Sequence, residues 1–206
     1  MKKILLAAAA VCALTSGAAQ AQAEGPWLVR ARAVHLDSAN KDSTGLGLSI
    51  NDKTIPELDI TYFFSPNFAA ELVLTVPQKQ TVTVQQSALG GPVDIGTFKH
   101  LPPTLMLQYH FLPEATVRPY VGAGLNYTRI SSVKLAVPTV GRLDLENSSF
   151  GFAVGAGVDI AIAKNVFLNF DVKKVQIRSD VSHLGQTLST VKIDPWLFGA
   201  GVGYRF

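Results

Sequence analysis

Hydrophobic and polar residues alternate with a period of two along most of the chain. The clearest case is the last stretch, 194–206. One register there is apolar or aromatic throughout, and the other is mainly glycine; the apolar register holds Trp196, Phe198, Ala200, Val202, Tyr204 and Phe206. Successive side chains of a β-strand point to opposite faces. The alternation therefore predicts a strand with one continuous apolar face.

Seven further segments alternate in the same way. We therefore predict eight strands, at residues 27–36, 56–64, 68–76, 103–111, 117–128, 149–162, 166–177 and 194–206. The apolar faces of strands two to six and of the last strand hold no charged residue. A Lys or Arg at mid-bilayer on a lipid-facing surface costs about 2–4 kcal/mol, so this absence is typical of strands that face lipid.

The connections between these segments alternate in length. Short turns join strands two and three, four and five, and six and seven, whereas longer polar segments occupy residues 37–54, 77–101, 129–148 and 179–191. Together these patterns predict an all-β fold: an eight-stranded antiparallel transmembrane β-barrel, an up-and-down meander with short periplasmic turns and long extracellular loops. Aromatic residues near the short turns are typical of an interfacial girdle.

The N-terminal segment predicts export. Lys2 and Lys3 precede an apolar run at 4–14, and small residues at 19–21 and 21–23 fit a cleavage site. We expect a signal peptide at 1–21, with cleavage after residue 21 or 23, and a barrel at 22–206 in the outer membrane of a Gram-negative bacterium. Cys12 is the only cysteine, so the barrel itself holds no disulfide or thiolate site. Without the two lysines the formal charge falls from +3 to +1, and nothing indicates a nucleic-acid partner.

The inward faces of the strands differ between the two halves of the predicted barrel. Toward the periplasm we expect a polar floor of mixed charge, formed by Arg30, Glu71, Arg118, Asp159, Asp171 and Arg205. Charges buried in this way must pair. The floor is therefore either a structural salt-bridge plug or a path for ions or protons.

Toward the outer half, the inward residues are apolar. The expected hydrophobic lining consists of Val34, Leu36, Val73, Met106, Val175, Ile177 and Leu197, with glycines beside it that leave volume unfilled. A concave apolar pocket with few polar groups suits a small hydrophobic ligand. The alternative is that these side chains only pack against one another, because an eight-stranded barrel is narrow enough to be filled.

Other chemistry finds little support in the residues. The four histidines show no short metal-binding spacing, and Ser148, Ser149 and His183 lie at loop edges without a catalytic motif. We therefore expect no metal, no cofactor and no enzymatic activity. Pro119, in the fifth strand, cannot donate to a ladder and predicts a missing hydrogen bond or a bulge in the wall.

Several motifs together resemble the OmpW family of small outer-membrane barrels. They are GPWLVRA at 25–31, LPPTL at 101–105, QYHF at 108–111, RPYVGAGLNY at 118–127, GAGVD at 155–159, DPW at 194–196 and GYRF at 203–206. The resemblance implies a narrow apolar-lined channel and passive uptake of small hydrophobic molecules, with lateral release into the membrane. One departure is Lys173, which stands where some relatives carry a constricting inward aromatic residue.

Two hypotheses follow. The first is a channel for small hydrophobic ligands, with Pro119 as a candidate lateral opening. The alternative is a filled structural barrel whose outer loops act as a receptor or adhesion surface, for example for phage or bacteriocin. In either case outer-membrane lipid surrounds the barrel. The terminal strand with Tyr204 and Phe206 is similar to the signal that the barrel assembly machinery recognises.

Overall fold

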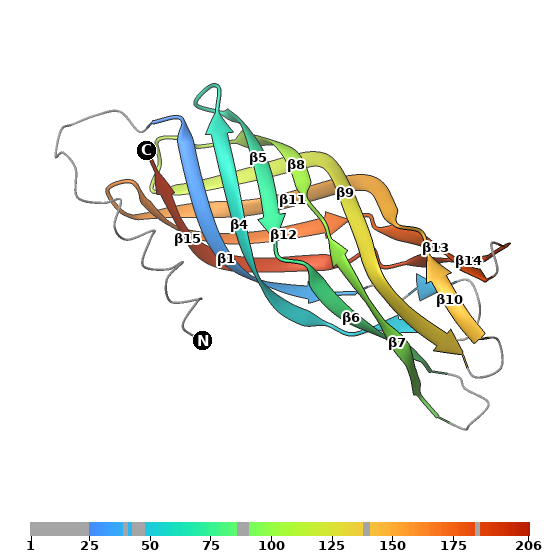
Figure 1. The fold of residues 1–206 in the computed structure, drawn as a ribbon. Coiled ribbons are helices and arrows are strands. Elements are labelled where there is room, and N and C mark those ends of the chain that lie inside the picture. The colour runs from blue at the N-terminus through green and yellow to red at the C-terminus, as the bar shows by residue number, and fades with distance from the viewer. Residues whose placement is uncertain (1–24, 39–40, 43–47, 86–90, 138–140, 184–185) are drawn as a thin grey trace.

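The computed structural model describes residues 25–38, 41–42, 48–85, 91–137, 141–183 and 186–206. The expected signal peptide at 1–21 lies outside this part of the chain. Eight strands form the barrel wall: β1 (Trp27–Asp37), β4 (Lys53–Phe63), β5 (Phe68–Thr75), β8 (Thr104–His110), β9 (Val117–Val137), β11 (Ser148–Ala163), β12 (Val166–Val175) and β15 (Trp196–Arg205). Figure 1 shows them as a tilted ring.

Each of these strands pairs with its sequence neighbour in antiparallel register. The order runs β1, β4, β5, β8, β9, β11, β12, β15, and the pairing of β15 with β1 closes the ring. Trp27 and Phe206 exchange backbone hydrogen bonds of 3.1 and 2.8 Å, so the ladder runs to the last residue. The predicted eight-stranded antiparallel up-and-down barrel is thus confirmed.

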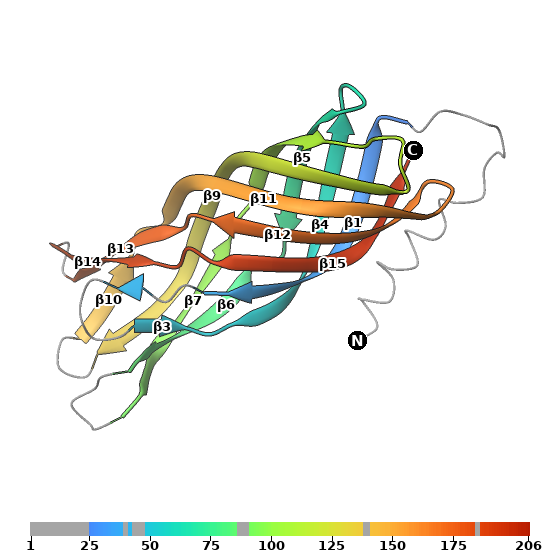
Figure 2. The same ribbon diagram turned by 180° about the vertical axis from the view of Figure 1, so that it is seen from behind.

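The long connections contain strands that the sequence pattern did not lead us to predict. They are β2 (Lys41–Asp42), β3 (Leu48–Ile50), β6 (Gln78–Val84), β7 (Val93–Leu101), β10 (Gly141–Leu145), β13 (Arg178–His183) and β14 (Gln186–Lys192). With the far half of β9 they continue the wall at one end of the barrel (Figures 1 and 2). The outward residues of this extension include exposed Lys79, Lys99 and Lys134, so it stands beyond the lipid.

The outer face of the eight wall strands is the apolar one. Leu58, Leu105, Leu107 and Phe152 are exposed, whereas Arg30 is completely buried inside. This polarity is the reverse of a soluble protein and is what lipid requires of a transmembrane barrel. Among the described residues, no helix is long and apolar enough to span a membrane.

Aromatic side chains gather at both edges of the lipid-facing band. At the end with the short turns, contacts of 4.7 to 6.2 Å between ring centroids join Trp27 to Tyr62, Phe68 to Tyr109 and Tyr204 to Phe206. At the other edge Trp196 stacks on Phe198. Amphipathic aromatic rings favour the membrane interface. Outer-membrane barrels have short turns in the periplasm and long connections outside, so the short turns mark the periplasmic edge and the strand extension lies outside the cell.

Candidate functional site: an ionic layer beneath an apolar chamber

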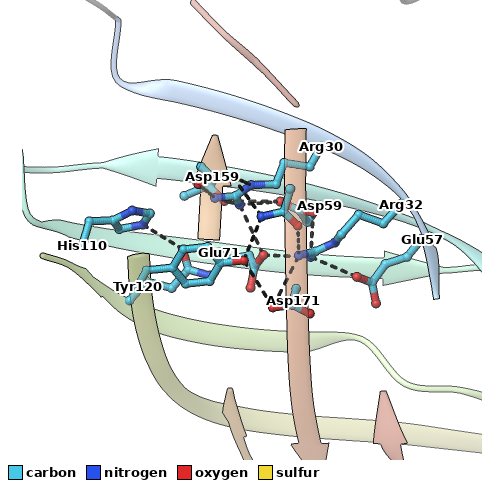
Figure 3. A network of polar contacts seen from close by, with 12 residues as sticks. Arg30, Arg32, Glu57, Asp59, Glu71, His110, Tyr120, Asp159 and Asp171 are labelled. Carbon is cyan, nitrogen blue, oxygen red and sulfur yellow. Dashed lines mark hydrogen bonds and ion pairs between the residues drawn. The ribbon is translucent and has the colours of Figure 1, made fainter. Parts of the chain in front are cut away.

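A layer of paired charges crosses the barrel interior (Figure 3). Its centre is Arg30 on β1. This guanidinium donates to both carboxylate oxygens of Asp159 on β11, at 3.0 and 2.6 Å, and to Asp59 on β4 at 3.0 Å. A bidentate arginine–carboxylate pair is among the strongest polar contacts in proteins. Arg30 therefore ties opposite walls of the barrel together.

Arg32 and Lys173 complete the layer on the extracellular side of Arg30. One guanidinium nitrogen of Arg32 lies 2.9 Å from Glu57, 2.7 Å from Asp59 and 3.0 Å from Glu71. Lys173 lies 2.6 Å from Asp171 and 3.5 Å from Glu57. We call this set the ionic layer; its charged members are Arg30, Arg32, Glu57, Asp59, Glu71, Asp159, Asp171 and Lys173. All are buried, so the layer closes the lumen to axial passage in this conformation.

Glycines on the opposing strands make room for these long side chains. A Cβ on Gly203 would approach the Arg30 side chain to 3.0 Å, and one on Gly201 would approach Arg32 to 2.7 Å. The Tyr120 ring occupies the space in front of Gly157, where its hydroxyl contacts Asp171 and Asn169 at 3.3 and 3.1 Å. The expectation that the glycines beside the apolar lining leave unfilled volume is wrong at Gly201, because the neighbouring strand fills that space.

Four of the six predicted floor residues belong to the ionic layer, namely Arg30, Glu71, Asp159 and Asp171. Arg118 and Arg205 lie lower, at the periplasmic mouth, where their guanidinium groups cover the rings of Phe167 and Phe63 at 4.8 and 3.9 Å. The sequence reasoning did not include Arg32, Glu57, Asp59 or Lys173 in the floor. All four stand at inward positions of the period-two alternation, so the signal is present in the sequence.

Above the ionic layer the interior is largely apolar. The seven predicted lining residues all face inward; six are buried and Leu197 is half-buried. A larger cluster lies further out and was missed, because it comes from the segments predicted as loops. Its members include Ile50, Val82, Val84, Ile95, Phe98, Ile130, Leu135, Leu145, Val181 and Ile193. The period-two pattern of 78–84 was the signal that could have found part of it.

A cavity separates the ionic layer from this outer cluster. Glu57 and Lys173 line it on the side of the ionic layer; its walls are formed by Leu36, Ile55, Val73, Thr75, Gln78, His100, Pro102, Thr104, Val175, Ile177, Pro195 and Leu197. We call it the chamber. Its volume is about 20 Å³, and a second cavity inside the outer cluster holds about 30 Å³. Each has room for about one water molecule, so side chains must move before a larger molecule enters.

His100 in the chamber wall has an unusual environment. It lies on β7, in the extension beyond the lipid-facing band, and is only 1% exposed. Burial, with a smaller contribution from the charge of Lys53, lowers the pKa of His100 from 6.5 to about 4. The imidazole is therefore neutral at physiological pH.

Val175 is shared by the chamber and a depression on the outer surface. The depression has a volume of about 280 Å³ and is also lined by Phe152, Val154, Lys174 and Asp194. The β11–β12 ladder ends here, at the pair Ala153–Val175. The depression thus lies at the height of the chamber.

Of the two outcomes expected at Pro119, a missing hydrogen bond or a bulge, the bulge does not occur. It pairs with Val158 in an unbroken β9–β11 register, and its carbonyl accepts a 3.0 Å hydrogen bond from Phe111. The β8–β9 ladder ends one residue away, at His110–Tyr120, so only a terminal hydrogen bond is missing. Pro119 lies near the periplasmic end of the wall, far along the strand from the chamber.

No group of three or more His, Cys, Asp or Glu side chains suited to a metal ion occurs in the part of the chain described by the structure. His35, on the outer face of β1, contacts Thr54 at 3.2 Å. Ser149 accepts a hydrogen bond from the backbone of Arg178 at 3.0 Å. Ser149 thus has a structural partner in the wall.

Comparison with known proteins gives one consistent result. The model of the OmpW family matches residues 23–206. Outer membrane protein W of Vibrio cholerae is 36% identical over the full length of both chains. An uncharacterized outer-membrane protein of Sinorhizobium fredii, y4mB, is 40% identical over 96% of this chain and 90% of its own.

A more distant relative and one solved structure complete the comparison. The dibenzothiophene metabolism operon protein PahQ of Pseudomonas aeruginosa is 26% identical over 76% of this chain and 73% of its own. The crystal structure of the outer membrane protein OprG from the same species superposes with a TM-score of 0.76. It is 26% identical in sequence, and the match covers 89% of this chain and 97% of that one.

Proposed function

The chain belongs to the OmpW family, and from this premise we propose that it takes up small hydrophobic molecules passively through the chamber and releases them sideways into the membrane. The protein lies in the outer membrane of a Gram-negative bacterium, surrounded by lipid. The observation that carries the proposal is an apolar lumen that ends on a sealed layer of charge. Apolar walls suit an apolar solute, and the ionic layer below offers it no favourable contact.

The predicted lining residues are the proposed path. Leu36, Val73 and Val175 line the chamber, and Met106 packs within the outer apolar cluster. We place the lateral exit beside Val175 in preference to Pro119, because the chamber and the outer depression share that residue. The relative named for dibenzothiophene metabolism is in keeping with an apolar cargo, since dibenzothiophene is an aromatic thioether.

An engineered disulfide tests the exit. The chain beyond residue 21 contains no cysteine, and directly paired residues of an antiparallel ladder lie within disulfide range. We expect the oxidised disulfide of Ala153→Cys/Val175→Cys to slow the uptake of naphthalene into vesicles. Reduction of the disulfide should restore the native rate of uptake. Ala33→Cys/Ala200→Cys, a paired position on the β1–β15 seam, is the matched control. Its uptake of naphthalene should be the same with and without reductant.

Charge in the chamber tests the path itself. Val73→Arg should abolish uptake, whereas Val73→Leu, which keeps the position apolar, should retain most of it. Heat-modifiable migration on gels confirms that each variant is folded. If naphthalene uptake by the native protein does not exceed that of empty vesicles, transport is refuted.

The filled interior favours a second candidate. Cavities of 20–30 Å³ are what a structural barrel would contain, and the strand extension presents a large extracellular surface. In that case the extracellular part serves as a receptor or adhesion surface for a phage, bacteriocin or host ligand. Deleting residues 86–90 from the outer connection would then abolish ligand adsorption and leave barrel folding intact.

We also propose that the barrel assembly machinery recognises the C-terminal strand through Tyr204 and Phe206. Both rings belong to the periplasmic aromatic edge and stack at 6.2 Å. A strand that ends on an accessible aromatic pair offers a recognisable terminus.

A further inference from the structure

The side chains of His100 and Gln80 are buried above the ionic layer and have no hydrogen-bond partner in the described part of the chain. Neither ring nitrogen of His100 is bonded, and neither amide atom of Gln80 is bonded. His100 is 1% exposed and Gln80 is 0% exposed. Buried polar groups are nearly always satisfied in native proteins, because an unmet donor or acceptor costs free energy. These two side chains therefore require an explanation beyond packing.

The two side chains lie close together on the inward face of one hairpin. Gln78 pairs with His100 and Gln80 pairs with Phe98 in the β6–β7 ladder, so Gln80 and His100 are diagonal neighbours, typically about 7–8 Å apart. His100 lines the chamber directly, whereas Gln80 lies further out along the hairpin and is not among the lining residues. The His100 ring packs edge-on against Phe98 with centroids 5.9 Å apart. The hydroxyl of Thr75 is a third unbonded group in the same wall.

The charged groups near the chamber are already paired. Glu57 lies 2.9 Å from Arg32 and 3.5 Å from Lys173, and Lys173 lies 2.6 Å from Asp171. An ionised ligand would find no unpaired counter-charge among these groups and would lose its hydration. A neutral imidazole and a carboxamide each donate and accept hydrogen bonds. Their natural match is an uncharged oxygen group, which does the same or accepts only.

We propose that the chamber selects small molecules that carry one uncharged oxygen function, a hydroxyl or a carbonyl, on an apolar body. His100 and Gln80 hydrogen-bond the oxygen, and Leu36, Val73 and Val175 contact the apolar body. This specificity rests on the proposed uptake of hydrophobic molecules and narrows it. Molecules without oxygen still pass but leave the two side chains unsatisfied, which lowers their affinity.

The test compares two probes that share one ring system. Binding of 1-naphthol and of naphthalene to the full-length mature barrel is measured in detergent micelles, and the ratio of the two dissociation constants is compared between variants. Because micelle partitioning of each probe is the same for every variant, it cancels in this comparison. We expect His100→Phe/Gln80→Met to reduce the preference for 1-naphthol about tenfold, as loss of one or two hydrogen bonds predicts.

Control measurements distinguish recognition from a general effect on the lumen. Gln108→Met changes a buried amide that is already bonded to His110 at 3.2 Å and should leave the preference unchanged. With ¹⁵N-histidine labelling, 1-naphthol should shift the ring nitrogens of His100 by more than naphthalene does. Both variants are checked for folding by heat-modifiable migration.

The outcomes separate this inference from the proposed function. If both probes bind and the double variant keeps the native preference, the oxygen-recognition site is refuted while uptake stands; His100 is then satisfied by a buried water alone. If neither probe binds the native barrel, uptake and recognition fall together. A reduced preference with unchanged naphthalene affinity supports the proposal.

Discussion

Removal of Arg30 should be among the most destabilising single changes in the barrel. Asp159 receives both of its charged contacts in the ionic layer from Arg30, and after Arg30→Met only the Asn169 amide, at 2.9 Å, remains to it within the layer. Asp59 keeps Arg32 at 2.7 Å. Breaking a buried pair by deleting one partner costs about 3–5 kcal/mol, because a buried charge is left uncompensated. We therefore expect a loss of this size in the free energy of unfolding.

The double variant tests the cause. Arg30→Met/Asp159→Leu removes both charges, and replacing a buried pair with apolar groups is often neutral. It should recover at least about 2 kcal/mol relative to the sum of the single variants, a coupling typical of contacting residues. Ala31→Leu, on the lipid face of the same strand, should change stability by no more than about 0.5 kcal/mol.

Urea-induced unfolding from lipid vesicles, followed by tryptophan fluorescence, is measured for the native protein, Arg30→Met, Asp159→Leu, the double variant and Ala31→Leu. Trp27 and Trp196 are both partly exposed to lipid, at 43% and 46%, and report its loss. The reasoning is refuted if Arg30→Met costs less than about 1 kcal/mol, or if the two single effects simply add.

Three further predictions concern other parts of the molecule. Gly157→Val should cost about 1–3 kcal/mol, because its Cβ would lie 2.4 Å from the Tyr120 ring, whereas Ala156→Val on the lipid face should cost little; the same urea unfolding compares them. His100 has a folded pKa of about 4, below its ordinary 6.5, so its contribution is present above pH 6.5 and is lost as the pH falls toward 4. His100→Phe should therefore remove up to about 3 kcal/mol of the acid-induced loss of stability, and equal slopes for both proteins between pH 7 and 4.5 would contradict this. Phe206→Ala should reduce the amount of barrel assembled in the outer membrane of cells yet change refolding in vitro little. Phe111→Ala, at the same membrane edge, is the control and should not reduce assembly. Equal losses of assembled barrel for the two variants would argue against a C-terminal signal.

The membrane-spanning fold could be predicted because lipid imposes a strict rule on sequence. Every second residue of a wall strand must be apolar, and the terminal strand from Trp196 to Arg205 obeys this rule without exception. Beyond the lipid the outward residues need not be apolar, so the alternation no longer marks a strand. β9 continues to Val137 with exposed Arg129 and Lys134 on its outer face, so its outer half looked like a polar loop, although Ile130 and Leu135 still face inward.

The ionic layer could be predicted only in part, and the reason for this limit is different. Alternation tells which face a residue occupies, and it puts Glu57 and Asp59 on the inward face. Which inward charges meet depends on strand register and on rotamers across the lumen. Arg32 reaches three carboxylates on two neighbouring strands, and a Cβ on Gly201 would collide with the Arg32 side chain in that position. A pattern read along single strands does not contain that information.

The relative costs of the two exits support the lateral one. Axial passage requires Arg30 and Arg32 to leave their carboxylates, at about 3–5 kcal/mol for each buried charge left without its partner. Displacing Val175 exchanges one apolar neighbour for another, since the solute inside and the lipid outside are both apolar. The remaining costs are a strained rotamer, about 0.5–1.5 kcal/mol, and the two backbone hydrogen bonds that close the wall there. Gln176 donates to Phe152 at 2.8 Å and Val175 donates to Pro195 at 3.2 Å, and each bond costs about 1–3 kcal/mol to break. An apolar solute that has entered the chamber would therefore leave through the wall, and the ionic layer would direct the path without ever opening.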